Sequence, residues 1–266
     1  MQETTAQAPA RAKIAVRGLT MAYGSFVVMR DLNFDVADKD IFVIMGGSGC
    51  GKSTLLRHLI GLQEPASGRV LFDGEDFTAT PAAERARFIR RFGVMYQSGA
   101  LWSSLTLAEN IAMPLEEHTD LKAKAIRDLV SYKLALVGLS GYEDHYPAQI
   151  SGGMNKRAGI ARAMALDPDI LFLDEPGAGL DPLSARRLDD LILRLRDGLG
   201  STIVVVTHEL ASIFAIANQS VFLDSATRTQ GATGNPADLR DHSDNPAVRL
   251  FLRRGGETAV PSNTTP

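Results

Sequence analysis

Apolar and polar residues follow one another along this chain in a pattern that marks buried strands separated by helices. Short apolar runs, which are typical of strands covered on both faces, occupy residues 40–45, 170–173 and 202–206. Segments with helical composition come after or between these runs, at residues 52–62, 155–166 and 182–199. This alternation predicts an α/β fold in which helices cover a mainly parallel sheet.

Two regions depart from that alternation. Residues 14–17 and 26–28 are short β-branched and aromatic runs on either side of a turn at residues 23–25, a pattern that predicts small antiparallel strands. Residues 104–137 have helical composition throughout. We therefore expect a small antiparallel β part near the N-terminus and a mostly helical middle.

Composition and charge narrow the class of protein. With 28 Lys and Arg residues against 31 Asp and Glu residues, the net charge is −3, so the chain lacks the overall basic character that nucleic-acid binding favours. Cys50 has no second cysteine to pair with, which fits a reducing compartment. Residues 1–13 lack the apolar stretch of a secretion signal, and residues 210–223 are too short and polar to cross a bilayer. We expect a cytoplasmic protein that reaches any membrane through a partner.

The strongest chemical signal is the segment GGSGCGKS at residues 46–53, between a predicted strand and a predicted helix. It matches the phosphate-binding loop pattern, in which backbone N–H groups surround phosphates at the start of a helix. Lys52 is expected to reach the β- and γ-phosphates, and Ser53 to offer its hydroxyl to Mg²⁺. The predicted ATP-binding residues here are Gly46, Gly47, Ser48, Gly49, Cys50, Gly51, Lys52, Ser53 and Thr54. An ordinary glycine turn is the alternative interpretation.

Cys50 lies inside this segment, beside Lys52 and the start of the predicted helix. Such an electropositive setting lowers the pKa of a thiol and raises its reactivity. We expect alkylation of Cys50 to inhibit hydrolysis.

Two carboxylates follow the predicted strand at residues 170–173. Asp174 is expected to complete the Mg²⁺ shell, because a phosphate-binding loop needs an acidic group near its metal ion. Glu175 points to another side of the chain and is expected to hold the water that attacks the γ-phosphate. Two acids at a strand-end turn, without a catalytic role, are the alternative.

Further motifs appear in the order found in the ATP-binding cassette ATPases, and the chain resembles that family over nearly its whole length. The matching positions are Tyr23, Gln97, Ile150–Met154, Gly179–Asp181 and His208. The resemblance implies a P-loop nucleotide-binding domain with a mainly parallel core sheet, a small antiparallel β subdomain and a helical subdomain at about residues 98–165. It also implies an ATPase that uses ATP and Mg²⁺.

The resemblance assigns a role to each of these motifs. Tyr23 would stack on adenine, Gln97 would bind Mg²⁺ and sense the γ-phosphate, and His208 would contact that phosphate during catalysis. The signature residues Ser151, Gly152, Gly153 and Met154 would bind ATP, as would Asp181. In the head-to-tail dimer that the resemblance implies, the Ser151 site of each chain would close the nucleotide of the other. Taken singly, a serine here is a helix cap, a turn tyrosine packs, and a strand-end histidine makes structural hydrogen bonds.

A narrower resemblance covers residues 93–110 and 114–119, which look like the ATPase subunits of MCE-type transporters serving Mla-like phospholipid systems. It implies a peripheral subunit on the cytoplasmic face of a bacterial inner membrane. Its implied partners are an integral permease, an MCE-domain protein and a small cytoplasmic accessory subunit. Residues 97–104 would then contact the permease, with Leu101 and Trp102 in a groove, although Trp102 is alternatively a core aromatic.

Two other functions remain open at this stage. The same motor would serve another importer, such as one for amino acids or metals. An ATP-gated clamp on nucleic acid or ribosomes is disfavoured, because the 54 residues from Gln97 to Ser151 are too few for long coiled-coil arms.

The expected boundaries follow from this interpretation. Residues 1–12 would form a flexible N-terminus, residues 13–247 the ATPase domain, and residues 248–266 a partly disordered C-terminal extension.

Overall fold

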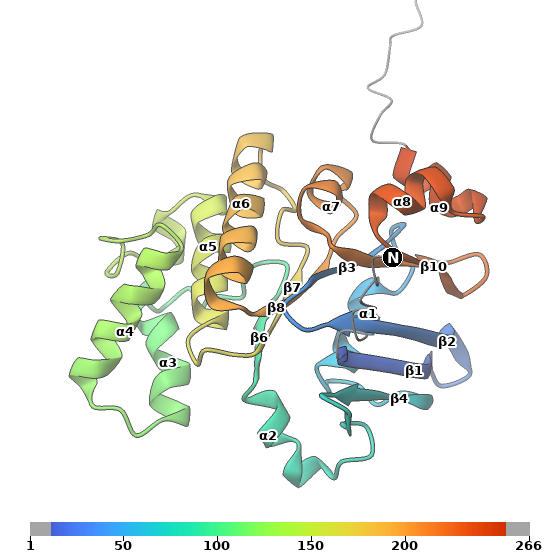
Figure 1. Ribbon diagram of the computed structural model, residues 1–266. Helices are drawn as coiled ribbons and strands as arrows, with labels where there is room; N and C mark the ends of the chain where they lie inside the picture. The colour runs from blue at the N-terminus through green and yellow to red at the C-terminus, as the bar shows by residue number, and fades with distance from the viewer. Residues whose placement is uncertain (1–11, 254–266) are drawn as a thin grey trace, which may run out of the picture.

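A mixed, mostly parallel sheet lies at the centre of residues 12–253, the part of the chain that the computed structural model describes (Figure 1). Its strand order is β10-β9-β3-β8-β7-β6, and only the β9–β10 pair is antiparallel. The strands are β3 (Ile41–Gly46), β6 (Phe92–Met95), β7 (Ile170–Asp174), β8 (Thr202–Val206), β9 (Gln219–Asp224) and β10 (Thr229–Gly234). The predicted α/β class with a mainly parallel core sheet is confirmed.

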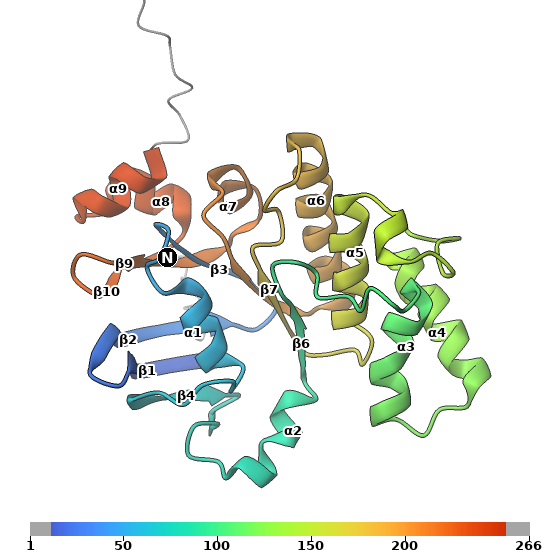
Figure 2. The ribbon, with the colours of Figure 1, turned by 180° about the vertical axis from the view of Figure 1, so that it is seen from behind.

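The central strands are buried along their whole length because both faces of the sheet are covered. Along β3, Ile41, Val43 and Met45 pack into one apolar cluster, whereas Phe42 and Ile44 pack into the other. As Figure 1 and Figure 2 show from opposite sides, helices α5 (Gly152–Ala163), α6 (Pro182–Leu199) and α7 (Leu210–Ile216) lie on one side. Helix α1 (Lys52–Leu59) lies on the other side with the antiparallel sheet. Continuous apolar runs are what such doubly covered strands require.

A second, antiparallel sheet has the order β2-β1-β4-β5. It contains β1 (Ala12–Tyr23), β2 (Phe26–Ala37), β4 (Ser67–Phe72) and β5 (Glu75–Asp76). The predicted hairpin is present, with Tyr23 opposite Phe26, but its strands extend well beyond residues 14–28. Ile14, Val16 and Met21 are buried on the face toward the core.

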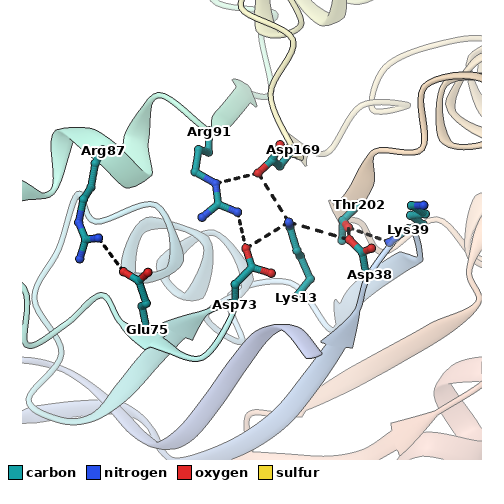
Figure 3. Close-up of polar contacts among 9 residues, drawn as sticks. All are labelled: Lys13, Asp38, Lys39, Asp73, Glu75, Arg87, Arg91, Asp169 and Thr202. Carbon is teal, nitrogen blue, oxygen red and sulfur yellow. Dashed lines mark hydrogen bonds and ion pairs between the residues drawn. The ribbon is translucent and has the colours of Figure 1, made fainter. Parts of the chain in front are cut away.

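A network of ion pairs joins this sheet to the start of the central strands (Figure 3). Lys13 of β1 places Nζ 3.2 Å from Asp73, which follows β4, and 3.6 Å from Asp169, which precedes β7. Arg91, just before β6, pairs with both of these carboxylates. Since the four charged residues lie at the ends of four different strands, two from each sheet, the network links the antiparallel sheet to the central sheet.

The helical part contains α3 (Leu107–His118), α4 (Ala123–Leu136) and α5 (Gly152–Ala163), which confirms the predicted helical middle. Thr106 and Glu109 form a capping box that begins α3. Asn110 then bonds the backbone of Trp102 in both directions, by accepting from its N–H and donating to its carbonyl. These bonds fix the loop that leads into α3. The other helices near the site are α1 (Lys52–Leu59), α6 (Pro182–Leu199) and α7 (Leu210–Ile216).

The C-terminal boundary has to be corrected. After α8 (Pro236–His242), helix α9 (Pro246–Arg253) runs across residues 247/248, where we expected the domain to end. Val248 and Leu252 are fully buried in the apolar cluster that also contains Ile41, Val43 and Met45, here called the main apolar cluster, so residues 248–253 belong to the domain. Ala12 likewise opens β1. The expectations for residues 1–11 and 254–266 fall outside the described residues.

None of the helices that the structure describes combines the length and the apolar character needed to cross a membrane.

Candidate nucleotide site

The predicted phosphate-binding loop connects the end of β3 to the first turn of α1. Gly51 precedes the helix with φ of 101°, a left-handed conformation that favours glycine. A Cβ at this position would also come within 2.9 Å of the side chain of Val28, on β2. The loop therefore needs a residue without a side chain where its backbone turns into the helix.

Lys52 points back into the loop that it follows. Its side chain is buried, and Nζ donates hydrogen bonds to the carbonyls of Gly46 at 3.0 Å and Gly47 at 3.1 Å. The positive charge is thus held inside the curve of the backbone, beside the N-terminus of α1. A phosphate bound by the loop would meet this ammonium group as well as backbone N–H groups.

Ser53 and Asp174 come together although they are far apart in sequence. The Ser53 hydroxyl donates a hydrogen bond of 3.3 Å to Oδ1 of Asp174, the last residue of β7. Burial raises the pKa of Asp174, and the neighbouring carboxylate of Glu175 raises it further, whereas the bond from Ser53 lowers it. A hydroxyl beside a carboxylate near a phosphate loop suits Mg²⁺, which binds few protein oxygens and completes its shell with phosphate and water. The residues present fit the predicted ion.

Glu175 leaves the strand abruptly, with a left-handed φ of 46°. Its N–H donates to the carbonyl of Val206 at 2.8 Å, and Oε1 lies 2.8 Å from Nδ1 of His208. Among the described side-chain atoms, Oε2 of Glu175 is buried and has no hydrogen-bond partner. His208 therefore orients one carboxylate oxygen. The other can accept a hydrogen bond from a water molecule, or a proton.

Lys156 was not among the predicted site residues, yet it lies at the centre of this group. Its side chain is 8% exposed, and Nζ donates to the backbone carbonyls of Gln97 and, at 3.3 Å, of Glu175. Burial lowers the pKa of its amine, while the carboxylates of Asp174, Glu175 and Glu209 act in the opposite direction. In the sequence, Lys156 is one of several basic residues in α5, and nothing local distinguishes it.

The signature residues form a second group. Ser151 caps α5 by accepting a 3.3 Å bond from the N–H of Met154, and Asp181 caps α6 through the N–H groups of Leu183 and Ser184. The two caps are neighbours, because a Cβ added at Gly153 would lie 3.5 Å from Cβ of Ser184. In the described part of the chain, no hydrogen bond joins this group to residues 46–54.

Tyr23 and Gln97 lie at the borders of the site. Tyr23 is the last residue of β1 and is half exposed. This end of β1 lies beside the phosphate loop, because the methyl group of Met21 would lie 3.6 Å from a Cβ placed at Gly51. Gln97 follows β6, and its backbone carbonyl accepts from Lys156. The roles predicted for these two side chains stay predictions.

Comparison with known proteins then decides the family. A family model described as "ABC transporter" matches residues 29–178. The chain belongs to the ABC transporter family. The "Intermembrane phospholipid transport system ATP-binding protein MlaF" of Escherichia coli K12 is 38% identical over 93% of this chain and 91% of that protein. The "Probable ribonucleotide transport ATP-binding protein mkl" of Mycobacterium leprae is 41% identical over 92% of this chain and 70% of that protein.

Solved ABC cassettes share the fold at 26% identity. A cassette of Clostridium perfringens that is part of an ABC transporter complex superposes with a TM-score of 0.80 over 92% of this chain and 98% of that one. A dimeric cassette in a post-hydrolysis state, bound to ADP and Pi, gives a TM-score of 0.75 over 84% and 98%. The predicted family, fold and ATPase activity are confirmed: the chain is the ATP-binding, ATP-hydrolysing subunit of an ABC transporter.

The prediction that the setting of Cys50 in this ABC ATPase lowers the pKa of its thiol and makes it reactive is wrong. Cys50 is 2% exposed and packs in the same apolar cluster as Phe42 and Ile44, with Sγ 2.7 Å from where a Cβ at Gly46 would lie. Burial raises the pKa of Cys50 and outweighs the opposing effect of Lys52. The sequence placed the residue beside a positive charge but gave no sign that its side chain turns into the core.

We accordingly expect slow alkylation of Cys50 in the folded ATPase. Because the thiol is buried and its pKa is raised, iodoacetamide should modify it at least about tenfold more slowly than in the same chain unfolded in denaturant. Intact-mass spectrometry over a time course measures both rates. Equal rates would contradict the buried position.

Proposed function

We propose that this chain is the ATP-hydrolysing motor of a bacterial transporter that moves phospholipid between the inner and outer membranes. The observation that carries this proposal is the similarity to MlaF over 91% of that protein's length. The resemblance of residues 93–119 to the ATPases of Mla-like systems supports the same branch. The relative named for ribonucleotide transport is slightly more identical but is matched over only 70% of its length, so ribonucleotide remains the competing cargo.

In the proposed cycle, the loop at residues 46–54 holds the phosphates of ATP, with Lys52 neutralising their charge. Ser53 and Asp174 would hold Mg²⁺, and Gln97 is the further predicted ligand. When bound, Mg²⁺ supplies positive charge that stabilises the transferring phosphoryl group. Glu175 would accept a proton from the attacking water, and His208 would orient Glu175 through their 2.8 Å contact.

A second copy of the chain would complete each site. Ser151, Gly152, Gly153 and Met154 present a helix N-terminus, and Asp181 lies beside it, but this group has no bond to the phosphate loop of its own chain. In a head-to-tail pair, each signature would face the nucleotide of the other chain. The dimeric form of a solved cassette supports this arrangement.

A groove beside the helical part is the proposed permease contact. It has a volume of about 510 Å³, and its lining includes Ile89, Trp102, Met113 and Pro114. Trp102 is 59% exposed, so its alternative interpretation as a core aromatic is wrong. Leu101 instead packs against the main apolar cluster. An exposed Trp at a groove is typical of protein interfaces, and we propose that a cytoplasmic segment of the permease binds here.

Replacing Trp102 with Glu should uncouple transport from hydrolysis. Loss of a central interface Trp typically weakens binding by about 2 kcal/mol, or roughly 30-fold in affinity. We expect the variant to lose most transport in cells while the purified chain keeps its basal ATPase rate. Tyr132→Glu on α4, where the ring is 52% exposed and outside the groove, is the matched control. Equal losses of transport in both variants would remove the groove from the proposal.

The partners follow from the same proposal. We propose that the chain lies on the cytoplasmic face of the inner membrane, bound to an integral permease, with an MCE-domain protein and a small cytoplasmic accessory subunit in the assembly. The test is purification of the tagged chain from its native membrane in mild detergent, followed by mass spectrometry of bound proteins and lipids. The Trp102→Glu variant, purified in the same way, should recover less permease.

Recovery of a permease, an MCE-domain protein and phospholipid with the unaltered chain supports the proposal. Recovery of a different importer permease, of ribosomes or of nucleic acid would overturn the lipid assignment.

A further inference from the structure

Lys156 connects the segment at Gln97, which leads to the proposed permease groove, with the turn at Glu175, the proposed general base. Its Nζ donates to the carbonyl of Gln97, where the chain leaves β6 toward the groove, and to the carbonyl of Glu175, the proposed base. Lys156 itself stands on α5, which begins at the signature serine, Ser151. One buried ammonium group therefore touches the backbone of two functional loops from a third functional element.

The loop on the Gln97 side lies closely along α5. A Cβ at Gly159 would come within 3.0 Å of the Gly99 carbonyl, and Arg162 donates to the carbonyl of Ala100 at 2.6 Å. Two residues later, Trp102 enters the groove. A shift of the groove segment would therefore be transmitted to α5 and to the carbonyl that Lys156 holds.

The backbone on the Glu175 side is held from several directions. Glu175 has a left-handed φ of 46°, which is unfavourable for a residue with a side chain and requires support from its surroundings. Its carbonyl accepts from Lys156 and, at 3.2 Å, from the N–H of Ala178, while its own N–H donates to Val206. Lys156 thus supports the turn that aims the carboxylate.

We propose that Lys156 is a positioning residue for hydrolysis, which ties the orientation of the Glu175 carboxylate to the position of the Gln97 loop. Its two hydrogen bonds within the described residues go to the backbone carbonyls of Gln97 and Glu175, and none goes to the phosphate loop, Ser53 or Asp174, so we expect it to act mainly through the position of the Glu175 carboxylate. The proposal rests on the assignment of Glu175 as base. It gives the groove beside Trp102 a physical route to the reaction centre.

The first test is the ATPase kinetics of Lys156→Met, which removes the ammonium group and keeps an apolar chain of similar length. We expect kcat to fall at least about tenfold, because small misplacements of a catalytic group are costly. The KM for ATP should change by less than about twofold, since Lys156 has no hydrogen bond to the phosphate loop, Ser53 or Asp174. Lys156→Arg, which keeps the charge and donors, should recover most of the rate.

The matched control is Lys133→Met, which removes another buried ammonium group of the helical part, paired with Asp167, which precedes β7 whereas Glu175 follows it. We expect its kcat to remain within about twofold of the unaltered protein. If both lysine variants lose the same activity, the effect is general destabilisation and the proposal is overturned. If Lys156→Met does not fold, Lys156→Gln is measured in its place.

The second test separates this proposal from the assignment on which it rests. In a background of Glu175→Gln, the change Lys156→Met should cause no further loss of hydrolysis, because its effect runs through the carboxylate. Losses that multiply would overturn the positioning role while leaving Glu175 as base. Full activity of Glu175→Gln alone would overturn both. Hydrogen exchange should rise in residues 97–100 and 175–178 together in Lys156→Met, and a rise in neither would also overturn the proposal.

Discussion

Replacing Glu175 with Gln should stop ATP hydrolysis while leaving ATP binding in place. The amide keeps the size of the side chain but cannot take a proton from water, and loss of a general base typically lowers the rate about 10²- to 10⁴-fold. Binding should persist because Glu175 contacts His208 and backbone groups, whereas Lys52 and the loop at residues 46–54 are the groups proposed to hold the phosphates. Steady-state phosphate release and nucleotide titration measure the two effects separately.

The same variant should collect as a dimer when MgATP is added, because the nucleotide that joins the two chains is no longer consumed. Light scattering would show the molar mass doubling with MgATP and remaining that of a single chain without it. Asp128→Asn, the same type of change on the exposed face of α4, is the control and should hydrolyse ATP normally. Hydrolysis at the unaltered rate in Glu175→Gln would remove Glu175 from its role.

Replacing Lys52 with Ala should weaken ATP binding itself. The variant loses a buried ammonium group that the loop holds beside its backbone N–H groups. A hydrogen bond to a charged group contributes about 1.5–3 kcal/mol, which corresponds to roughly 10- to 150-fold in affinity. Calorimetric titration with ATP gives the dissociation constant directly.

Lys124→Ala is the matched control for this prediction. Lys124 is exposed on α4 and pairs with Asp128, so its loss should leave the affinity unchanged. ATP binding by Lys52→Ala as tight as that of the control would mean that the loop does not hold phosphates in the predicted way.

The sequence predicted well the structural features that depend on local patterns, whereas the roles of the site residues stay predictions. The buried strands were visible as apolar runs, because doubly covered strands have no polar face. The phosphate loop and the acids Asp174 and Glu175 stood at strand ends, and parallel strands bring such ends to one edge of a sheet. The 3.3 Å bond between Ser53 and Asp174 agrees with that expectation.

Other features depend on which way a side chain turns in three dimensions. Cys50 follows the loop pattern, but its thiol turns into the core, and no local signal reports that direction. Lys156 looks like an ordinary polar residue of α5 and becomes important only where that helix meets Glu175. The sequence indicated a terminal extension at Val248 and Leu252 because most of the apolar cluster in which they are buried comes from residues far away in the sequence.

The central claim, that this ATPase drives phospholipid movement, is tested most directly by reconstituting the membrane assembly that co-purifies with the chain into vesicles. Labelled phospholipid and labelled ribonucleotide are then followed with and without ATP, and the assembly carrying Glu175→Gln sets the background. We predict ATP-dependent movement of phospholipid that the variant abolishes. ATP-dependent uptake of ribonucleotide without any movement of phospholipid would contradict the claim.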